Sequence, residues 1–278
     1  MEVVRKANLV SKRPHHSRVR EGAVRGIKGK VVVVTGGGGG IGSATCLRFS
    51  DAGARVVVCD VNADAAQAVV EEIRGKGGEA VAVPVDLTDY DATQAAVGMI
   101  EETVGPIDVL VNNAGWDVFT PFLTSGPEFW SKLIDINLRS VLNITHPVLA
   151  RMSERSAGRI VSIASDAARV GSSGESVYAA CKAGVIAFSK TLAREQARKG
   201  ITFNCVCPGA TETGMLESFM DAAGNKEKLR DAFTRAIPMG RLGQPGDLPG
   251  AILFFASDDA ASITGQVISV SGGLTMHG

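Results

Sequence analysis

Three side chains in the second half of the chain have the types and the spacing needed to exchange a proton with a bound molecule. Tyr178 and Lys182 stand four residues apart in a segment of helical pattern, so they lie one turn apart on the same face. Ser165 ends an apolar run that precedes them. A tyrosine with its ordinary pKa of about 10 is a poor base, but a neighbouring ammonium favours the phenolate. We therefore expect Ser165 to hold a substrate oxygen, Tyr178 to exchange a proton with it, and Lys182 to supply the charge.

Each of these residues also has a plainer interpretation. Tyr178 could be a core aromatic, Lys182 a surface charge and Ser165 a strand-end cap. Taken singly, those interpretations are favoured. The three residues together, downstream of a cofactor-binding pattern, favour catalysis.

That pattern is the sequence VVVVTGGGGGIGSA, residues 31–44, which places glycines between an apolar run and a segment of helical pattern. Without Cβ atoms the glycines let a pyrophosphate approach the backbone, and the free N–H groups of the first helical turn face its charge. A tight strand-to-helix turn with no ligand is the plainer alternative. Two registers fit a dinucleotide fingerprint: G-x-G-x-x-G on Gly37, Gly39 and Gly42, or T-G-x-x-x-G-I-G on Thr35, Gly36, Gly40, Ile41 and Gly42.

A carboxylate follows at the distance expected for contact with a ribose. Asp60 ends the second apolar run, where it can accept both ribose hydroxyls and would repel a 2′-phosphate. No basic residue stands beside it or among the glycines, so we predict NAD rather than NADP as cofactor. At the end of the third apolar run, Asp86 and Leu87 are predicted to flank the adenine. Capping of the helix that starts near Thr88 is an equally good interpretation of Asp86.

The elements that must position these residues alternate along the chain. Stretches with helical spacing separate apolar runs that are continuous rather than alternating, as in strands buried on both faces. We therefore expect one α/β domain with a doubly wound, seven-stranded parallel sheet, helices on both faces, and ligands beyond the carboxyl ends of the strands. The predicted strands are residues 31–35, 55–60, 80–86, 107–115, 159–165, 201–209 and 265–273.

Composition narrows the classes of protein. The chain has 278 residues, 45% of them hydrophobic, and 29 basic residues balance 29 acidic ones, so no basic field is available for nucleic acid. Five cysteines without a C-x-x-C pair predict buried free thiols in a reducing compartment, which we take to be the cytoplasm. The histidine spacing suggests no metal site, and no apolar run is long enough to span a membrane.

Residues 1–28 differ from the remainder because they are rich in Arg and Lys and poor in acidic residues. We expect a disordered extension here, since low hydrophobicity with excess charge cannot offset the entropy of ordering. A transit peptide and a tail for anionic surfaces are the alternatives. The absence of an apolar stretch in this segment excludes a secretory signal.

Several short motifs occur in the order typical of one enzyme family. They are T-G-x-x-x-G-I-G, N-N-A-G at residues 112–115, Asn137, Ser165, Y-x-x-x-K and Pro208-Gly209. Over residues 29–278 the chain thus resembles the short-chain dehydrogenase/reductase family, which has a Rossmann-type fold and transfers hydride between a secondary alcohol and a nicotinamide cofactor. The resemblance implies a homotetramer. One departure is Cys181, where the family more often has serine.

The resemblance also implies roles by position. Residues 112–115 would stabilise the central sheet and border the cofactor. Asn137 would bend its helix and anchor a water that links Lys182 to solvent, and Lys182 would bond the nicotinamide ribose. The residues that the resemblance places around the cofactor are Asn113, Ala114, Gly115, Tyr178, Lys182, Pro208, Gly209, Thr211 and Thr213.

Longer stretches, such as NNAGWDVFTPF and SIASDAARVGSSGESVYAACKAG, are similar to a branch of the family that oxidises a ring β-hydroxyacyl-CoA, 2-hydroxycyclohexanecarboxyl-CoA, with NAD. On this basis we expect an acyl-CoA thioester substrate, a pocket lined by Trp116, Asp117 and Arg169, and a substrate lid at residues 212–240. Two alternatives stay open. One is a 3-oxoacyl thioester reductase that acts on linear chains, and the other is an NAD-binding protein without catalysis.

Overall fold

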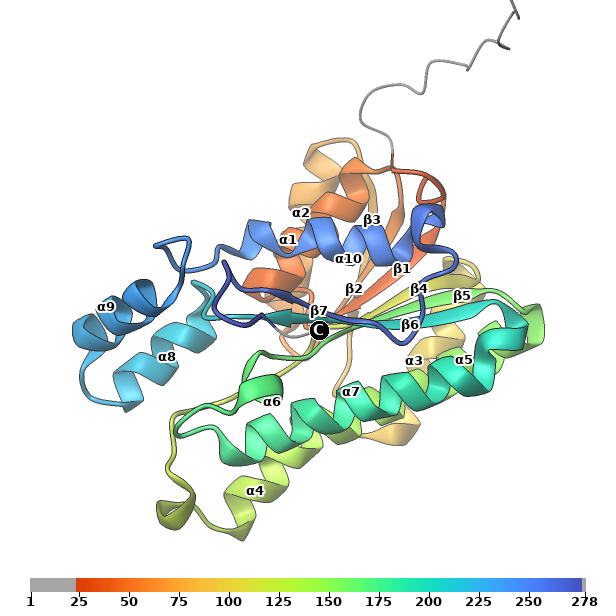
Figure 1. Ribbon diagram of the computed structural model, residues 1–278. Coiled ribbons are helices and arrows are strands. Elements are labelled where there is room, and N and C mark those ends of the chain that lie inside the picture. Colours follow the sequence, from red (N-terminus) through yellow and green to blue (C-terminus); the bar gives the residue numbers. More distant parts are fainter. Residues whose placement is uncertain (1–23, 277–278) are drawn as a thin grey trace, which may run out of the picture.

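The computed structural model describes residues 24–276, and its centre is a seven-stranded sheet in which every pairing is parallel (Figure 1). The strand order is β3-β2-β1-β4-β5-β6-β7. This confirms the doubly wound parallel sheet predicted from the continuous apolar runs. The strands are β1 (Val31–Thr35), β2 (Arg55–Asp60), β3 (Glu79–Pro84), β4 (Ile107–Asn112), β5 (Gly158–Ile163), β6 (Ile201–Pro208) and β7 (Val267–Val270).

Helices cover both faces of the sheet, as predicted (Figure 1). Along β1, Val32 and Val34 belong to the core cluster on the side of α1, α2 and α10, while Val31 and Val33 belong to the cluster on the side of α3, α5 and α7. The helices are α1 (Gly40–Asp51), α2 (Ala63–Gly75), α3 (Tyr90–Thr103), α4 (Pro127–Ile134), α5 (Ser140–Arg155), α6 (Ala167–Val170), α7 (Ser176–Gln196), α8 (Gly214–Ala222), α9 (Lys226–Ala236) and α10 (Pro249–Ala256).

Two predicted strands are longer than the strands in the structure by three residues or more. The run at 107–115 leaves the sheet after Asn112. The run at 265–273 forms only the short β7, because Gly265, Gly272 and Gly273 adopt positive φ angles of 71°, 62° and 89°. Such angles suit turns and not strands.

The predicted extension at residues 1–28 overlaps the domain at its C-terminal end, and the remainder, residues 1–23, lies outside the described residues. Ile27 is completely buried and Val24 packs against the same core cluster. The Arg25 carbonyl accepts a hydrogen bond from the amide of Asp258, and its guanidinium pairs with Asp259. Residues 24–28 therefore pack on the domain, which the prediction missed because the charges masked two apolar residues.

Two further expectations concern the described residues. All five cysteines are buried and free, which confirms the prediction of buried thiols. Within residues 24–276, no helix is both long enough and apolar enough to cross a membrane.

The strand order places the carboxyl ends of β1 and β4 side by side, with β2 on one side of the pair and β5 on the other. Chain connections leave β1 and β4 in opposite directions, so a crevice opens between them. The glycine turn follows β1 and the N-N-A-G segment begins at the end of β4. Both therefore border this crevice.

Candidate active site

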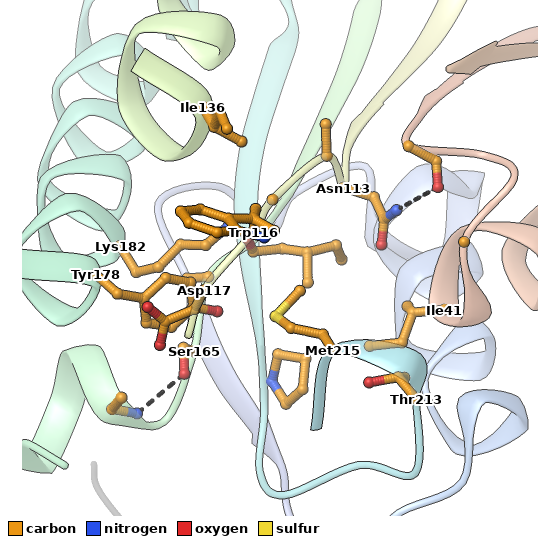
Figure 2. Close-up of a pocket in the computed structure, with 18 of the residues that line it drawn as sticks. Ile41, Asn113, Trp116, Asp117, Ile136, Ser165, Tyr178, Lys182, Thr213 and Met215 are labelled. Atoms are coloured by element: carbon orange, nitrogen blue, oxygen red, sulfur yellow. Dashed lines mark hydrogen bonds between the residues drawn. The ribbon is translucent and has the colours of Figure 1, made fainter. Parts of the chain in front are cut away.

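A cavity of about 1450 Å³ lies at the carboxyl ends of the strands. Its walls come from the segments that follow β1 to β6 and from residues of α8 and α9. Figure 2 shows some of the residues that line it. Small-molecule sites usually have volumes of roughly 300–1,000 Å³. This cavity is large enough to hold a dinucleotide together with a second molecule.

The glycine turn forms the wall nearest to α1. A Cβ atom at Gly42 would lie 2.1 Å from the carbonyl oxygen of Gly36, and Gly36 itself has a φ of +60°. Gly37 and Gly38 do not line the cavity, and Cβ atoms there would meet Val58 and Ala65. The structure therefore favours the register T-G-x-x-x-G-I-G, whose residues Gly36, Gly40, Ile41 and Gly42 all line the cavity, as does Gly39.

This turn fits the pyrophosphate of a dinucleotide. The first bond of α1 runs from the amide of Ser43 to the carbonyl of Gly39, so the N–H groups of the first helical turn have no acceptor within the helix. No acidic residue stands in that turn and no side chain caps it. The N-terminus of α1 therefore offers free donors and the positive end of a helix dipole to an anion in the cavity.

Asp60 faces the cavity at the end of β2. Its Oδ2 accepts a hydrogen bond from the Gly38 amide at 2.9 Å, and its Oδ1 accepts one from the Asn62 amide at 2.9 Å. These bonds fix the orientation of the carboxylate at the cavity wall.

Asp86 and Leu87 also line the cavity. The Asp86 carboxylate accepts hydrogen bonds from the amide and the hydroxyl of Thr88. The N-cap of α3 is Asp89, whose side chain accepts a bond from Ala92. The interpretation of Asp86 as a helix cap is thus wrong, because the helix starts farther along the chain, at Tyr90.

The N-N-A-G segment ties the glycine turn to the central strands. The side-chain amide of Asn113 donates to the carbonyls of Thr35 and Gly36, at 2.9 and 3.1 Å. The Thr35 hydroxyl oxygen accepts hydrogen bonds from the backbone amides of Asn113 and Ala114. Asn112 donates to the hydroxyls of Thr145 and Ser162. The segment therefore links β1, β4 and β5 at the cavity floor, where Asn113, Ala114 and Gly115 line the wall.

Ser165, Tyr178 and Lys182 lie together on the wall opposite the glycine turn (Figure 2). Ser165 follows β5, and its hydroxyl oxygen accepts a hydrogen bond from the amide of Ala167 at 3.1 Å. Tyr178 is 8% exposed and Lys182 3% exposed, both on α7. The Lys182 ammonium donates to the carbonyl of Ile163 at 3.0 Å. The structure thus brings together the three residues that the sequence singled out.

Asn137 lies behind this wall and not in it. It is completely buried in a single π-helical turn, Asp135–Arg139, between α4 and α5. Its amide nitrogen donates to the carbonyls of Trp116 and Leu133, and its oxygen accepts from the Trp116 amide. A Cβ atom at Gly115 would lie 3.0 Å from the Asn137 oxygen and 3.2 Å from the Lys182 nitrogen. Asn137 therefore holds the loop beside Lys182 in place.

Burial changes the charge states of the two groups on α7. Burial raises the pKa of Tyr178, and the carboxylates of Glu175 and Asp117 raise it further, while a hydrogen bond with Ser165 lowers it. Burial lowers the pKa of Lys182 to about 8. In the protein alone, burial and the two nearby carboxylates thus outweigh the neighbouring ammonium. A positively charged nicotinamide in the cavity would act in the opposite direction.

Of the three predicted substrate residues, two line the cavity. Trp116 packs edge to face on Phe129, with ring centres 5.9 Å apart, and the Lys132 ammonium lies 4.1 Å from its ring centre. Asp117 is 3% exposed. Arg169 is not in the wall: its guanidinium donates to the hydroxyl of Ser269 at 2.9 Å. The short helix α6 turns the Arg169 side chain towards β7, so the structure does not bring it together with Trp116 and Asp117.

The sequence interpretation missed Glu175 and the apolar residues of α8 and α9 that line the cavity. Glu175 directly precedes α7 and lines the cavity beside Asp117. The apolar wall consists of Met215, Leu216, Phe219, Phe233 and Ala236 on α8 and α9. The apolar spacing of these two short helices was a usable signal for the lid residues. Nothing in the sequence signalled that Glu175 would face Asp117.

The remaining predicted cofactor residues also line the cavity, near the start of α8. They are Pro208, Gly209, Thr211 and Thr213. The Thr213 hydroxyl caps α8 by accepting a hydrogen bond from the Leu216 amide at 3.3 Å. Helix α8 thus begins directly at the cavity wall.

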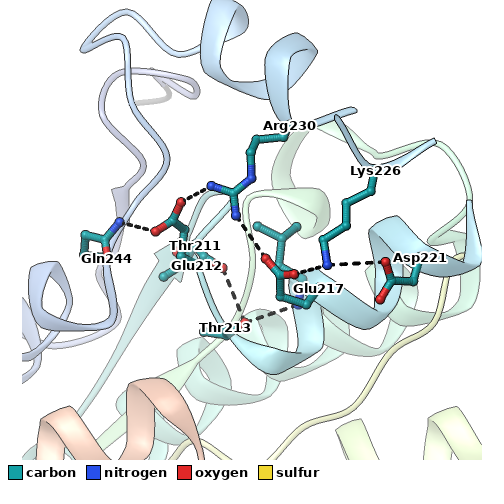
Figure 3. Close-up of polar contacts among 9 residues, drawn as sticks. Thr211, Glu212, Thr213, Glu217, Asp221, Lys226, Arg230 and Gln244 are labelled. Atoms are coloured by element: carbon teal, nitrogen blue, oxygen red, sulfur yellow. Dashed lines mark hydrogen bonds and ion pairs between the residues drawn. The ribbon is translucent and has the colours of Figure 1, made fainter. Parts of the chain in front are cut away.

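Ion pairs hold α8 and α9 together (Figure 3). Arg230 on α9 bonds Glu217 on α8 and Glu212 in the segment before it. Lys226 pairs with Glu217 and Asp221, and Gln244 donates to Glu212 at 2.7 Å. Both helices are therefore tied to each other and to the segments that join them to the domain.

Comparison with known proteins gives consistent results. The family model described as short chain dehydrogenase matches residues 30–224. The chain is 38% identical to the 3-oxoacyl-[acyl-carrier-protein] reductase of Thermotoga maritima, over 90% of this chain and 99% of that protein. It is 39% identical to the acetoacetyl-CoA reductase of Shinella zoogloeoides, over 88% of this chain and 98% of that protein.

A solved structure agrees with these relatives. A 3-oxoacyl-[acyl-carrier protein] reductase from Brucella melitensis with bound NAD superposes with a TM-score of 0.82 at 32% identity, over 90% of this chain and 92% of that one.

Proposed function

The chain belongs to the short-chain dehydrogenase/reductase family of NAD(P)-dependent oxidoreductases, and we propose that it uses NAD to interconvert 3-hydroxyacyl and 3-oxoacyl thioesters. The observation that carries the proposal is the position of Ser165, Tyr178 and Lys182 on one wall of a cavity whose opposite wall is the glycine turn. A dinucleotide on that turn would leave its reactive end facing these three side chains.

In the proposed reaction each side chain has a separate task. Ser165 donates a hydrogen bond to the substrate oxygen and holds it beside Tyr178. Tyr178 takes the hydroxyl proton during oxidation and returns it to the carbonyl oxygen during reduction. Lys182 bonds the cofactor ribose and stabilises the phenolate, while Asn137 holds the loop against which Lys182 packs. When bound, the nicotinamide supplies the hydride acceptor or donor.

Asp60 supports NAD as the preferred cofactor. Its carboxylate is fixed by two backbone amides at the cavity wall, where it can accept ribose hydroxyls. A 2′-phosphate at the same place would meet a like charge. The Brucella melitensis relative is a reductase with bound NAD, which agrees with this assignment.

The relatives support a thioester substrate and favour a linear acyl chain over the ring of 2-hydroxycyclohexanecarboxyl-CoA. Both curated relatives described above are named for reduction of 3-oxoacyl or acetoacetyl thioesters. The cavity wall agrees with an acyl group, because α8 and α9 contribute apolar side chains. The proposal covers the thioester group, which coenzyme A and acyl carrier protein both form, and does not choose between these two carriers.

The test is turnover of acetoacetyl-CoA with NADH, compared between the wild-type chain and Tyr178→Phe. We expect the wild-type chain to be active and the variant to lose about 10²–10⁴-fold in kcat, since it lacks its acid–base group. NADH binding, followed by fluorescence, should be retained. Equal activity of the two proteins would refute the role of Tyr178. NADH binding without turnover of any alcohol or ketone by the wild-type chain would instead indicate the non-catalytic alternative.

A further inference from the structure

Asp117 and Glu175 form a carboxyl pair beside the proposed acid–base group (Figure 2 labels Asp117). Asp117 lies in the loop after β4, and Glu175 directly precedes α7, three residues before Tyr178. Both carboxyl groups line the cavity together with Tyr178 and Lys182. The reaction proposed above uses neither of them.

The environment of Asp117 is unusual for a carboxylate. The residue is 3% exposed, and no side-chain donor within residues 24–276 bonds either of its oxygens. The neighbouring carboxyl is that of Glu175, which lines the same cavity. A hydrogen bond between two carboxyl groups would require that one of them holds a proton. Burial raises the pKa of Asp117 to about 8, and the charge of Glu175 raises it as well.

A buried carboxyl group without a hydrogen-bond donor costs stability, so the place of Asp117 next to the reacting group calls for a functional explanation. We propose that Asp117 and Glu175 are positioning residues that act through Tyr178: their negative charge holds the phenol in its protonated form. This inference rests on the proposed function, in which Tyr178 is the acid–base group.

The consequence concerns the two directions of the reaction. Reduction of a ketone needs the phenol as proton donor, and a pair that keeps Tyr178 protonated preserves this form to high pH. Oxidation needs the phenolate, so the same charge confines oxidation to alkaline solution. The pair therefore favours ketone reduction and extends to higher pH the range in which Tyr178 can donate a proton.

Other charged or titratable groups also face this region, and they limit what the pair alone can do. The Lys182 ammonium acts on Asp117 and offsets part of the negative charge. Lys132 and Glu128 on α4 line the outer part of the cavity. The buried thiols that act on Tyr178 or Lys182 are Cys181, Cys205 and Cys207. These thiols have raised pKa values and so stay neutral while the carboxylates ionise.

The test measures the ionisation of the Tyr178 phenol directly. The chain has only two tyrosines, so in a Tyr90→Phe background the phenolate absorbance reports Tyr178 alone. In this background we compare Asp117→Asn, Glu175→Gln, the double variant, and Glu102→Gln as a control that removes an exposed carboxylate on α3. The amide side chains keep the shapes of the pair and can hydrogen-bond each other.

We expect the double variant to lower the pKa of Tyr178 by about one unit or more, because two nearby charges are lost. Each single variant should shift it less, and Glu102→Gln should leave it unchanged. The rising limb of the pH profile for NAD-dependent oxidation of 3-hydroxybutyryl-CoA, or of any secondary alcohol that the protein oxidises, should move to lower pH by the same amount.

An unchanged phenolate titration in the double variant would overturn the inference. If the double variant fails to bind NADH, the single variants provide the test, since each must still lower the pKa of Tyr178. The titration needs no substrate, so its outcome is separate from that of the proposed function: inactivity towards thioesters refutes only the latter. If Tyr178→Phe keeps full activity while the titration shifts as expected, the charge effect stands but has no role in catalysis, and the inference is overturned.

Discussion

The ammonium nitrogen of Lys182 lies 5.7 Å from the centre of the Tyr178 ring and donates its hydrogen bond to the carbonyl of Ile163, at the end of β5. The two residues share one face of α7, but the lysine is held by the sheet. Its ammonium is therefore fixed within the cavity wall before any ligand binds. Burial of an ammonium group lowers the free energy of unfolding, and this decrease can be measured.

Lys182→Met should stabilise the protein at neutral pH. Burial lowers the pKa of Lys182 from 10.5 to about 8, so between these values the unfolded chain binds more protons than the folded one. The free energy of unfolding therefore rises with pH between these two pKa values. Below both values, the buried ammonium destabilises the folded state by the full amount. We expect the variant to gain about 1–3 kcal/mol at pH 7.

Urea unfolding at a series of pH values measures this effect. The gain should shrink as the pH rises and vanish near the ordinary pKa of lysine. Lys190→Met, on the exposed side of the same helix, is the matched control and should show no such trend. A Lys182→Met protein that is less stable than wild type at every pH would contradict the prediction.

Asp60→Ser should change the cofactor preference. The substitution removes the charge that would oppose a 2′-phosphate while keeping a small polar group at the end of β2. We expect the ratio of kcat/KM for NADPH to that for NADH to rise by about tenfold or more. Asp64→Asn, an exposed change in the first turn of α2, controls for net charge. If the wild-type protein already prefers NADPH, the assignment of NAD is wrong.

Trp116→Ala should separate the ring substrate from the linear one. The indole lines the cavity and is fixed by Phe129 and Lys132, so it offers a rigid apolar surface to an acyl group. If a ring packs on it, kcat/KM for 2-hydroxycyclohexanecarboxyl-CoA should fall about tenfold or more relative to 3-hydroxybutyryl-CoA. Trp130→Ala, outside the cavity wall, is the control. An unchanged ratio would rule out ring recognition by Trp116.

The sequence was sufficient to predict the sheet and most of the cavity. Strands such as Val31–Thr35 are buried on both faces, so they appear as continuous apolar runs. The glycine turn and Asp60 could be placed because residues at the carboxyl ends of parallel strands meet at one edge. Tyr178 and Lys182 could be paired because their spacing matches the helical repeat.

The sequence could not predict contacts that depend on the path of irregular segments. Arg169 follows a strand that ends at the cavity, yet one short helix turns its guanidinium to Ser269. Asp117 and Glu175 meet although they lie on separate loops, and no hydrophobic period marks a buried carboxyl group. The lowered pKa of Lys182 and the raised pKa of Tyr178 depend on burial, which the side-chain types alone do not reveal.

Gly42→Ala should damage the fold and the cofactor site together, whereas Gly75→Ala should not. An added Cβ at Gly42 would lie 2.1 Å from the Gly36 carbonyl and 2.8 Å from the Asn113 amide nitrogen, so the turn and the N-N-A-G segment must both shift. At Gly75, near the end of α2, the same atom meets nothing within 4 Å. Alanine there should stabilise the helix by about 0.5–1 kcal/mol.

We expect Gly42→Ala to lose at least about 2 kcal/mol of stability, as steric overpacking does. Its affinity for NADH should fall further than stability alone explains, because the N–H groups that face the pyrophosphate lie in the displaced turn. Thermal unfolding with and without NADH distinguishes the two effects. We do not expect the turn to accommodate a side chain, because of the close approach to Gly36. A Gly42→Ala protein that unfolds at the wild-type temperature and is stabilised equally by NADH would contradict this prediction.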